Sequence, residues 1–127
     1  MDEKIELIHT MAYQQFIPLF VRAGLEIDEN EECPEGLITC LELKDCRTEK
    51  TVGAAVLVYT ENVYVMKAVA VEKEYRGNGL GVLLVREILN EAERRGVDKV
   101  FLNEIHLAFL HAKTVHSCLL QFPLINF

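Results

Sequence analysis

One junction constrains the fold of this chain more than any other feature. An apolar run at 63–71, rich in β-branched residues, predicts a strand. A charged turn and glycines at alternate positions of 77–81 follow, and then 79–95 has the apolar spacing of a helix. Glycine lets the backbone approach a ligand closely, and the free N–H groups of a helix's first turn bind anions. The junction therefore predicts a phosphate-binding loop, with Arg76 as an added positive charge.

The spacing of the glycines limits which ligand the loop could bind. A Walker A loop requires Gly-Lys followed by Ser or Thr, and no such pair follows these glycines. A dinucleotide fingerprint requires a third glycine, but larger apolar residues occupy that position in both registers, and polar residues separate the strand from the loop. What remains is Arg-x-x-Gly-x-Gly, formed by Arg76, Gly79 and Gly81. A glycine-rich turn without a ligand is the alternative.

This pattern resembles the pyrophosphate loop of the GCN5-related N-acetyltransferases, the GNAT superfamily. Members commonly carry apolar-Ala-Val, then Glu-Tyr-Arg-Gly, then Gly-Leu-Gly or Gly-Ile-Gly, as this chain does in 69–71, 74–77 and 79–81. The resemblance covers about 37–102 and implies acetyl-CoA as the cosubstrate. It assigns the pantetheine arm to the backbone of Val69, Ala70 and Val71. It assigns the pyrophosphate to Arg76, Gly77, Asn78, Gly79, Leu80 and Gly81.

The expected elements form a mixed α/β sheet of the kind that the GNAT fold contains. Strands are expected over 5–8, 37–43, 52–60, 63–71 and 97–102, and helices over 11–23 and 79–95. Leu37, Thr39, Leu41 and Leu43 should lie on one face of their strand. The middle strands should form an antiparallel meander, and the strand–helix–strand passage implies one parallel neighbour. Pro18 should kink or split the first helix, and 1–127 should form one domain.

Residues 103–127 depart from the family pattern. Where members carry Phe-Tyr and Gly-Phe pairs on a helix, this chain has His111-Ala112 and His116-Ser117, so the tyrosine that often protonates the departing thiolate is absent. We expect one apolar helix over 105–121 and no room for two further strands. Two explanations of this tail remain open: the chain is a truncated or rearranged member of the family, or an altered reading frame produced the tail. The bare sheet edge that would result predicts pairing with a second copy as a homodimer.

Two residues are weak candidates for catalysis. Acetyl transfer to an amine requires a proton acceptor and a donor to the thioester oxygen. Many members place a carboxylate on the strand before the loop, but 64–68 contains none. Glu104 is a candidate base, with helix capping as its alternative, and Tyr64 is a candidate proton donor, with packing as its alternative. The C-terminal histidines are spaced five apart rather than four, so no metal site is expected.

Composition excludes several classes of protein. A net charge of −7 argues against a nucleic-acid binder, which needs a basic face. No apolar run approaches the ~20 residues of a membrane helix. The four cysteines form no C-x-x-C pair and the N-terminus has no apolar signal core, so a reduced, cytoplasmic setting is expected.

Three hypotheses follow from these residues. The first is an acetyl-CoA-dependent N-acetyltransferase in which a primary amine attacks the thioester directly. The second is a GNAT-like acyl-CoA-binding module with weak or no activity, because the usual tyrosine and the strand carboxylate are missing. The third is a phosphate- or nucleotide-binding domain of another α/β type.

Overall fold

The computed structural model describes residues 4–97, 99–102 and 119–121. Their strands form one six-stranded sheet in the order β1-β2-β3-β4-β5-β6. The strands are β1 (Ile5–Thr10), β2 (Leu37–Asp45), β3 (Lys50–Thr60), β4 (Val63–Val71), β5 (Lys99–Leu102) and β6 (Leu119–Gln121). Every neighbouring pair is antiparallel except β4 and β5, which are parallel. The predicted mixed sheet, with a meander and one parallel neighbour, is therefore confirmed.

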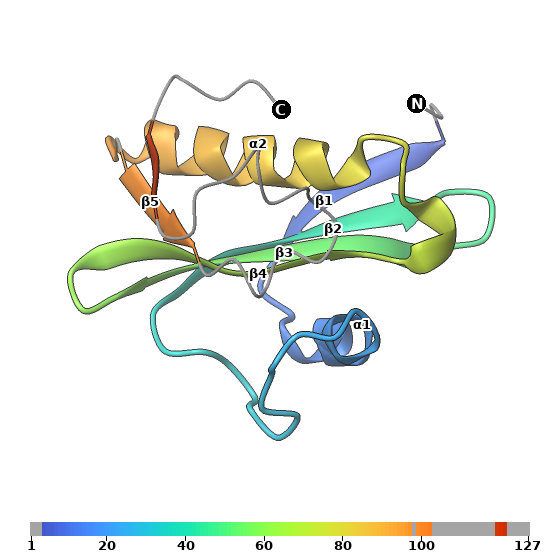
Figure 1. The fold of residues 1–127 in the computed structure, drawn as a ribbon, viewed down its shortest axis with the longest axis horizontal. Coiled ribbons are helices and arrows are strands. Elements are labelled where there is room, and N and C mark those ends of the chain that lie inside the picture. Colours follow the sequence, from blue (N-terminus) through green and yellow to red (C-terminus); the bar gives the residue numbers. More distant parts are fainter. Residues whose placement is uncertain (1–3, 98, 103–118, 122–127) are drawn as a thin grey trace.

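Helices pack on both faces of this sheet, α2 (Leu80–Arg94) on one and the short α1 (Ile17–Arg22) on the other (Figure 1). Two short 3₁₀ turns, η1 (Gln14–Phe16) and η2 (Lys73–Tyr75), precede α1 and α2 respectively. In the described part of the chain, no helix combines the length and apolar character needed to cross a membrane.

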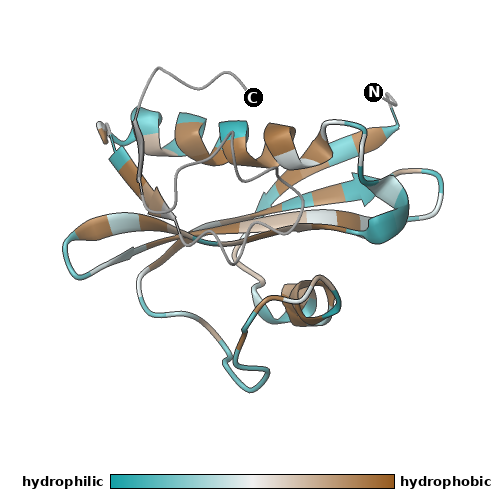
Figure 2. Cartoon of the chain, in the orientation of Figure 1, coloured by the Kyte–Doolittle hydropathy of each residue, from teal (hydrophilic) through white to brown (hydrophobic). Residues whose placement is uncertain are grey.

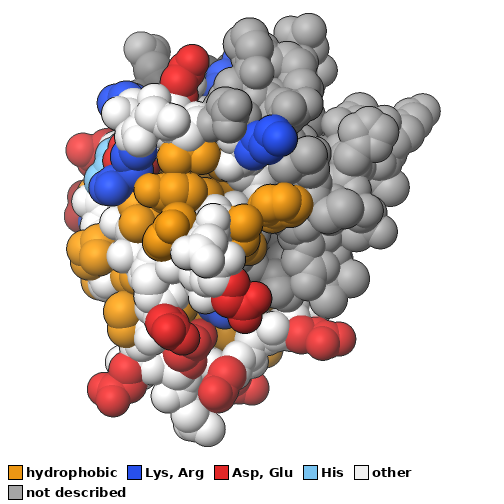
Figure 3. Space-filling model, turned by 90° about the vertical axis from the view of Figure 1, so that its left-hand side faces the viewer, with side chains coloured by type: hydrophobic (Ala, Val, Ile, Leu, Met, Phe, Trp, Pro, Cys, Tyr) orange, Lys and Arg blue, Asp and Glu red, His pale blue; other side chains and the backbone are white. Residues whose placement is uncertain are grey.

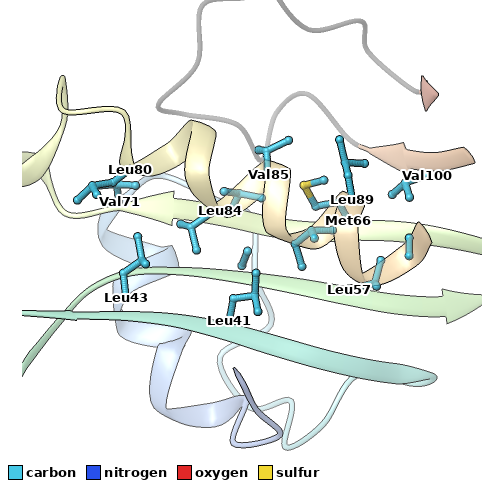
Figure 4. Close-up of a cluster of buried hydrophobic side chains, with 14 of the residues drawn as sticks. Leu41, Leu43, Leu57, Met66, Val71, Leu80, Leu84, Val85, Leu89 and Val100 are labelled. Carbon is cyan, nitrogen blue, oxygen red and sulfur yellow. The ribbon is translucent and has the colours of Figure 1, made fainter. Parts of the chain in front are cut away.

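Each face of the sheet has its own hydrophobic core, because the central strands are apolar over most of their length (Figure 2). On one face, Leu84 and Ile88 of α2 are fully buried against β2, β3 and β4. Figure 4 shows the α2 side chains directed at strand residues such as Leu43 and Met66. On the other face, Phe16 and Phe20 pack over small residues of β3 and β4. The end of β4 is thus held from both sides.

The first helix is shorter than predicted, and Pro18 is the reason. The Thr10 hydroxyl accepts the Ala12 N–H at 3.1 Å without starting a helix, and α1 begins only at Ile17. Proline has no N–H and clashes with the preceding turn, so Pro18 fits only in the first turn of a helix. The predicted split is confirmed, and Gly24, with a φ of +87°, follows the end of α1.

The predicted alternation along β2 is wrong at its start. Leu41 and Leu43 face the α2-side core, but Leu37 packs against the α1-side core. The register with β3 shifts between Leu37 and Thr39. A bulge inserts one extra residue, and a one-residue slip moves the following side chains to the opposite face.

The helix predicted over 105–121 is wrong at its C-terminal end. Leu119–Gln121 form β6, which pairs antiparallel with β5, so that Lys99 lies opposite Gln121. The outer edge of β5 is therefore covered, and the expectation of a bare edge there is also wrong. Residues 103–118 lie outside the described residues, and dimerisation stays a prediction.

Candidate active site

The glycine loop joins the end of β4 to the start of α2. Gly77 and Gly79 have φ values of +87° and +79°, which side chains disfavour. A Cβ added at either glycine would meet no atom within 4 Å, so the structure leaves open space beside the loop. Gly79 caps α2, and its carbonyl accepts the N–H of Leu83 at 3.0 Å. The N–H groups before Leu83 have no acceptor within the helix, which makes this terminus suited to an anion.

Asp45, the last residue of β2, contacts the segment before the loop at the same end of the sheet. The Tyr75 hydroxyl donates a hydrogen bond to Asp45 Oδ2 at 2.8 Å, and the backbone N–H of Arg47 donates to Oδ1 at 2.9 Å. The N–H of Arg47, and then the Tyr75 hydroxyl, lower the pKa of Asp45. The same bond raises the pKa of Tyr75, which keeps its hydroxyl a donor. The sequence alone does not single out Asp45 for this role.

Arg76 joins the loop to the strand. Its Nε donates to the carbonyl of Val71 at 2.9 Å, while the side chain stays exposed to solvent. A guanidinium has five N–H donors, so this bond leaves donors for a ligand. The Val71 carbonyl, which the resemblance assigns to the pantetheine arm, already accepts a bond from Arg76.

The end of β4 has one paired edge. On the β3 side, Val69, Ala70 and Val71 lie opposite Ala55, Ala54 and Gly53. On the β5 side, the pairing of the described residues is limited to Val65 and Met66, which precede 69–71. The three side chains of this segment are fully buried, so a ligand there would meet backbone groups. An extended amide-bearing ligand can add to such an edge as a strand does.

A bulge bends β4 where its described pairing with β5 ends. Val56 lies opposite Ala68 and Leu57 lies opposite Met66, which leaves Lys67 as the extra residue. Lys67 Nζ lies 3.8 Å from Glu31 Oε1, and the Tyr13 hydroxyl donates to the same oxygen at 3.1 Å. The structure thus brings a carboxylate to β4 from the loop between α1 and β2. The sequence gives no signal that singles out Glu31 among the acidic residues of that loop.

Arg22 fastens α1 to the same end of β4. Its guanidinium pairs with the carboxylate of Glu72, which is buried, and this bond raises the pKa of Arg22. A cavity of about 310 Å³ lies between α1 and the loop. Lys73 and Arg76 also line it, together with Glu72 and Glu74, so the strand end has charged groups of both signs around it.

Of the two weak catalytic candidates, the structure describes Tyr64 but not Glu104. Tyr64 lies beside the β3–β4 turn, half-buried against the α2-side core, with its ring centroid 4.7 Å from that of Tyr59. It precedes Val69 by five residues, about 16 Å along the strand. This environment fits its alternative role in packing. Glu104 lies outside the described residues, as do the C-terminal histidines.

Comparisons with known proteins agree with this geometry. The family model described as acetyltransferase (GNAT) family matches residues 5–116, which extends the resemblance beyond 37–102 on both sides. No curated protein matches the chain.

The fold is similar to several solved acetyltransferases at low sequence identity. A GNAT acetyltransferase from Staphylococcus aureus Mu50 has 18% identity and a TM-score of 0.63, over 78% of this chain and 72% of that one. A ribosomal-protein-alanine N-acetyltransferase from Brucella melitensis biovar Abortus has 18% identity and a TM-score of 0.58, over 78% and 79%. A GNAT acetyltransferase from Elizabethkingia anophelis, solved with acetyl-CoA bound, has 13% identity and a TM-score of 0.52, over 80% and 65%. With the family match over most of its length, the chain belongs to the acetyltransferase (GNAT) family.

Proposed function

We propose that this protein is an acetyl-CoA-dependent N-acetyltransferase in which a primary amine attacks the thioester directly. The observation that carries the proposal is the junction of β4 and α2, where two glycines with positive φ leave open space at a helix N-terminus. The acetyl-CoA bound to the similar Elizabethkingia structure supports the choice of cosubstrate.

The pyrophosphate of acetyl-CoA would bind across the loop, 76–81. Leu80 and Gly81 offer backbone N–H groups at the start of α2, and Arg76 offers the guanidinium donors that do not bind Val71. The pantetheine arm would extend along the backbone of 69–71. Because Arg76 already occupies the Val71 carbonyl, the arm would use the remaining backbone groups of this segment.

Direct transfer needs no covalent intermediate on the protein. The neutral amine nitrogen attacks the thioester carbonyl carbon and forms the C–N bond. The C–S bond breaks, its electron pair leaves with sulfur, and the proton lost by the amine passes through water to the departing thiolate. Negative charge develops on the carbonyl oxygen and requires nearby donors. We assign this role to backbone N–H groups of β4 at its bulge, where the extra residue leaves the ladder incomplete.

The cysteines of the described part support direct attack. Burial raises the pKa of the Cys40 thiol to about 12. Partial desolvation, and then the nearby Glu6 carboxylate, raise the pKa of the exposed Cys46 thiol. A nucleophilic cysteine needs a lowered pKa, because the thiolate is the reactive form. Cys33, Cys40 and Cys46 are all free thiols, which fits the reduced, cytoplasmic setting that we propose.

A second candidate function is an acyl-CoA-binding module that has lost turnover. The absence of a carboxylate from 64–68 and the packing of Tyr64 against Tyr59 favour it. Both candidates predict the same cosubstrate site, so only turnover separates them.

The test is release of free coenzyme A from acetyl-CoA in the presence of primary amines, followed with a thiol reagent and by mass spectrometry of the amine. We expect amine-dependent release by the native chain and none by Gly79→Glu, whose carboxylate would occupy the phosphate space. Circular dichroism should show that this variant is folded. Binding of acetyl-CoA without turnover of any amine would establish the binding module instead.

A further inference from the structure

Three polar side chains meet on the α1-side of β4, at its bulge. Tyr13 is 1% exposed, and its hydroxyl donates to Glu31 Oε1 at 3.1 Å. Lys67 Nζ lies 3.8 Å from the same oxygen. Burial, and then the Glu31 carboxylate, raise the pKa of the Tyr13 hydroxyl, so it remains a donor. One carboxylate oxygen is therefore held in place by a rigid, buried partner.

The second oxygen of Glu31 is left for another partner. Among the described residues, no hydrogen bond or ion pair engages Oε2, and the side chain is 27% exposed. Other acids of the same loop, such as Glu29 and Glu32, are exposed on its surface. Figure 3 shows acidic side chains gathered on the lower part of the molecule, where the loop between α1 and β2 lies. Glu31 is the member of this group that reaches the sheet.

The position of Glu31 relates it to the proposed reaction. Lys67 precedes Val69 by two residues, about 7 Å along β4, and the described β4–β5 pairing ends at Met66. An acyl group carried along 69–71 toward the bulge would approach this carboxylate. An anionic group at that point would favour a cationic acceptor.

We propose that Glu31 is the acceptor-binding residue, whose Oε2 accepts a hydrogen bond from a second, cationic group of a primary-amine acceptor, separate from the neutral nitrogen that attacks the thioester. The inference rests on the proposed function and adds the charge class of the acceptor to it. Tyr13 fixes the rotamer of Glu31, and Lys67 holds Oε1 on the side of β4, so that Oε2 faces the incoming amine.

The test compares Glu31→Gln with Glu32→Gln, a neighbouring change that removes the same charge from an exposed position of the loop. A hydrogen bond to a charged group contributes about 1.5–3 kcal/mol, so Glu31→Gln should raise KM for a cationic primary amine by about 10-fold or more. Glu32→Gln should leave KM within about twofold of the native value. Both variants should bind acetyl-CoA with unchanged affinity in calorimetry. Equal KM values for the two variants would overturn the assignment.

A second measurement separates failure of this inference from failure of the proposed function. Primary amines with and without a further positive charge are titrated against the native chain and both variants, with amide chemical shifts as the readout. Amine binding that is lost only in Glu31→Gln would support the inference even in a chain without turnover. Absence of amine binding by the native chain, in the presence or absence of acetyl-CoA, would overturn it. Absence of acetyl-CoA binding alone would overturn the proposed function.

Discussion

At the scale of single residues, buried polar contacts fix the loop that the sequence presents as exposed and charged. Asp45 is 1% exposed although it ends β2 beside an exposed turn. Its two oxygens accept bonds from Tyr75 and from the backbone of Arg47, so the β2–β3 turn and the glycine loop position each other. The tyrosine of the Glu-Tyr-Arg-Gly segment thus has a structural role beside the proposed phosphate site.

Asp45→Asn should destabilise the chain in a pH-dependent way. The pKa of Asp45 is lowered in the folded state, so its contribution is fully present above its unfolded value, about 3.9. That contribution is lost as the pH falls through the folded pKa. In urea titrations, the native protein should have a higher free energy of unfolding than the variant at neutral pH, and this difference should narrow on acidification. Glu49→Gln, in the same turn but exposed, should show no such difference; a pH-independent difference for Asp45→Asn would contradict the account.

Gly79→Ala should separate backbone strain from ligand binding when it is compared with Gly24→Ala. Both glycines have a positive φ and open space around the added Cβ. Left-handed backbone costs a residue with a Cβ about 1–2 kcal/mol, so both variants should lose similar unfolding free energy. Of the two variants, Gly79→Ala alone should also weaken acetyl-CoA binding, because its methyl group would lie beside the proposed phosphate site. Equal affinity of the two variants for acetyl-CoA would count against that site.

At the scale of elements, the strand–loop–helix junction could be predicted because its signals are local. The apolar run of β4, the glycines and the periodicity of α2 each lie within a short segment. The turn at Glu61 and Asn62 was also predictable, and both residues have the positive φ that a two-residue hairpin turn requires.

The predictions from the sequence were wrong where pairing with a distant strand decides the structure. The bulge that turns Leu37 to the α1 side depends on the register between β2 and β3, which the spacing of residues 37–43 does not encode. The strand at Leu119–Gln121 depends on β5 as its partner, whereas its own residues suit a helix equally well. Glu31 belongs to the same class, because contacts with Tyr13 and Lys67 distinguish it from the other acids of its loop.

Gly36→Ala should show how tightly the loop before β2 is packed. A Cβ at Gly36 would lie 1.8 Å from the carbonyl oxygen of Tyr59, and φ is +75°. The backbone N–H of Tyr59 donates to the Gly36 carbonyl at 2.8 Å, so neither segment can move away without breaking this hydrogen bond. We expect a loss of unfolding free energy about 2 kcal/mol or more greater than that of Gly24→Ala, measured by urea titration. Similar losses for the two variants would contradict this packing.

At the scale of the whole molecule, the sheet is what places the proposed sites together. The α2 face carries the helix whose N-terminus faces the proposed phosphate site, and the α1 face carries Tyr13 and Glu31. Among the described strands, β4 contributes to both, through the edge at 69–71 and the bulge at Lys67. The cosubstrate and the acceptor are therefore proposed to approach one strand from its two sides.

The most direct test of the account is calorimetric titration of the purified chain with acetyl-CoA, with ATP and NAD as controls. We expect saturable binding of acetyl-CoA alone, and loss of that binding in Gly79→Glu. Absence of acetyl-CoA binding by the folded native chain, or equal binding of ATP or NAD, would contradict the assignment of the β4–α2 junction as an acetyl-CoA site.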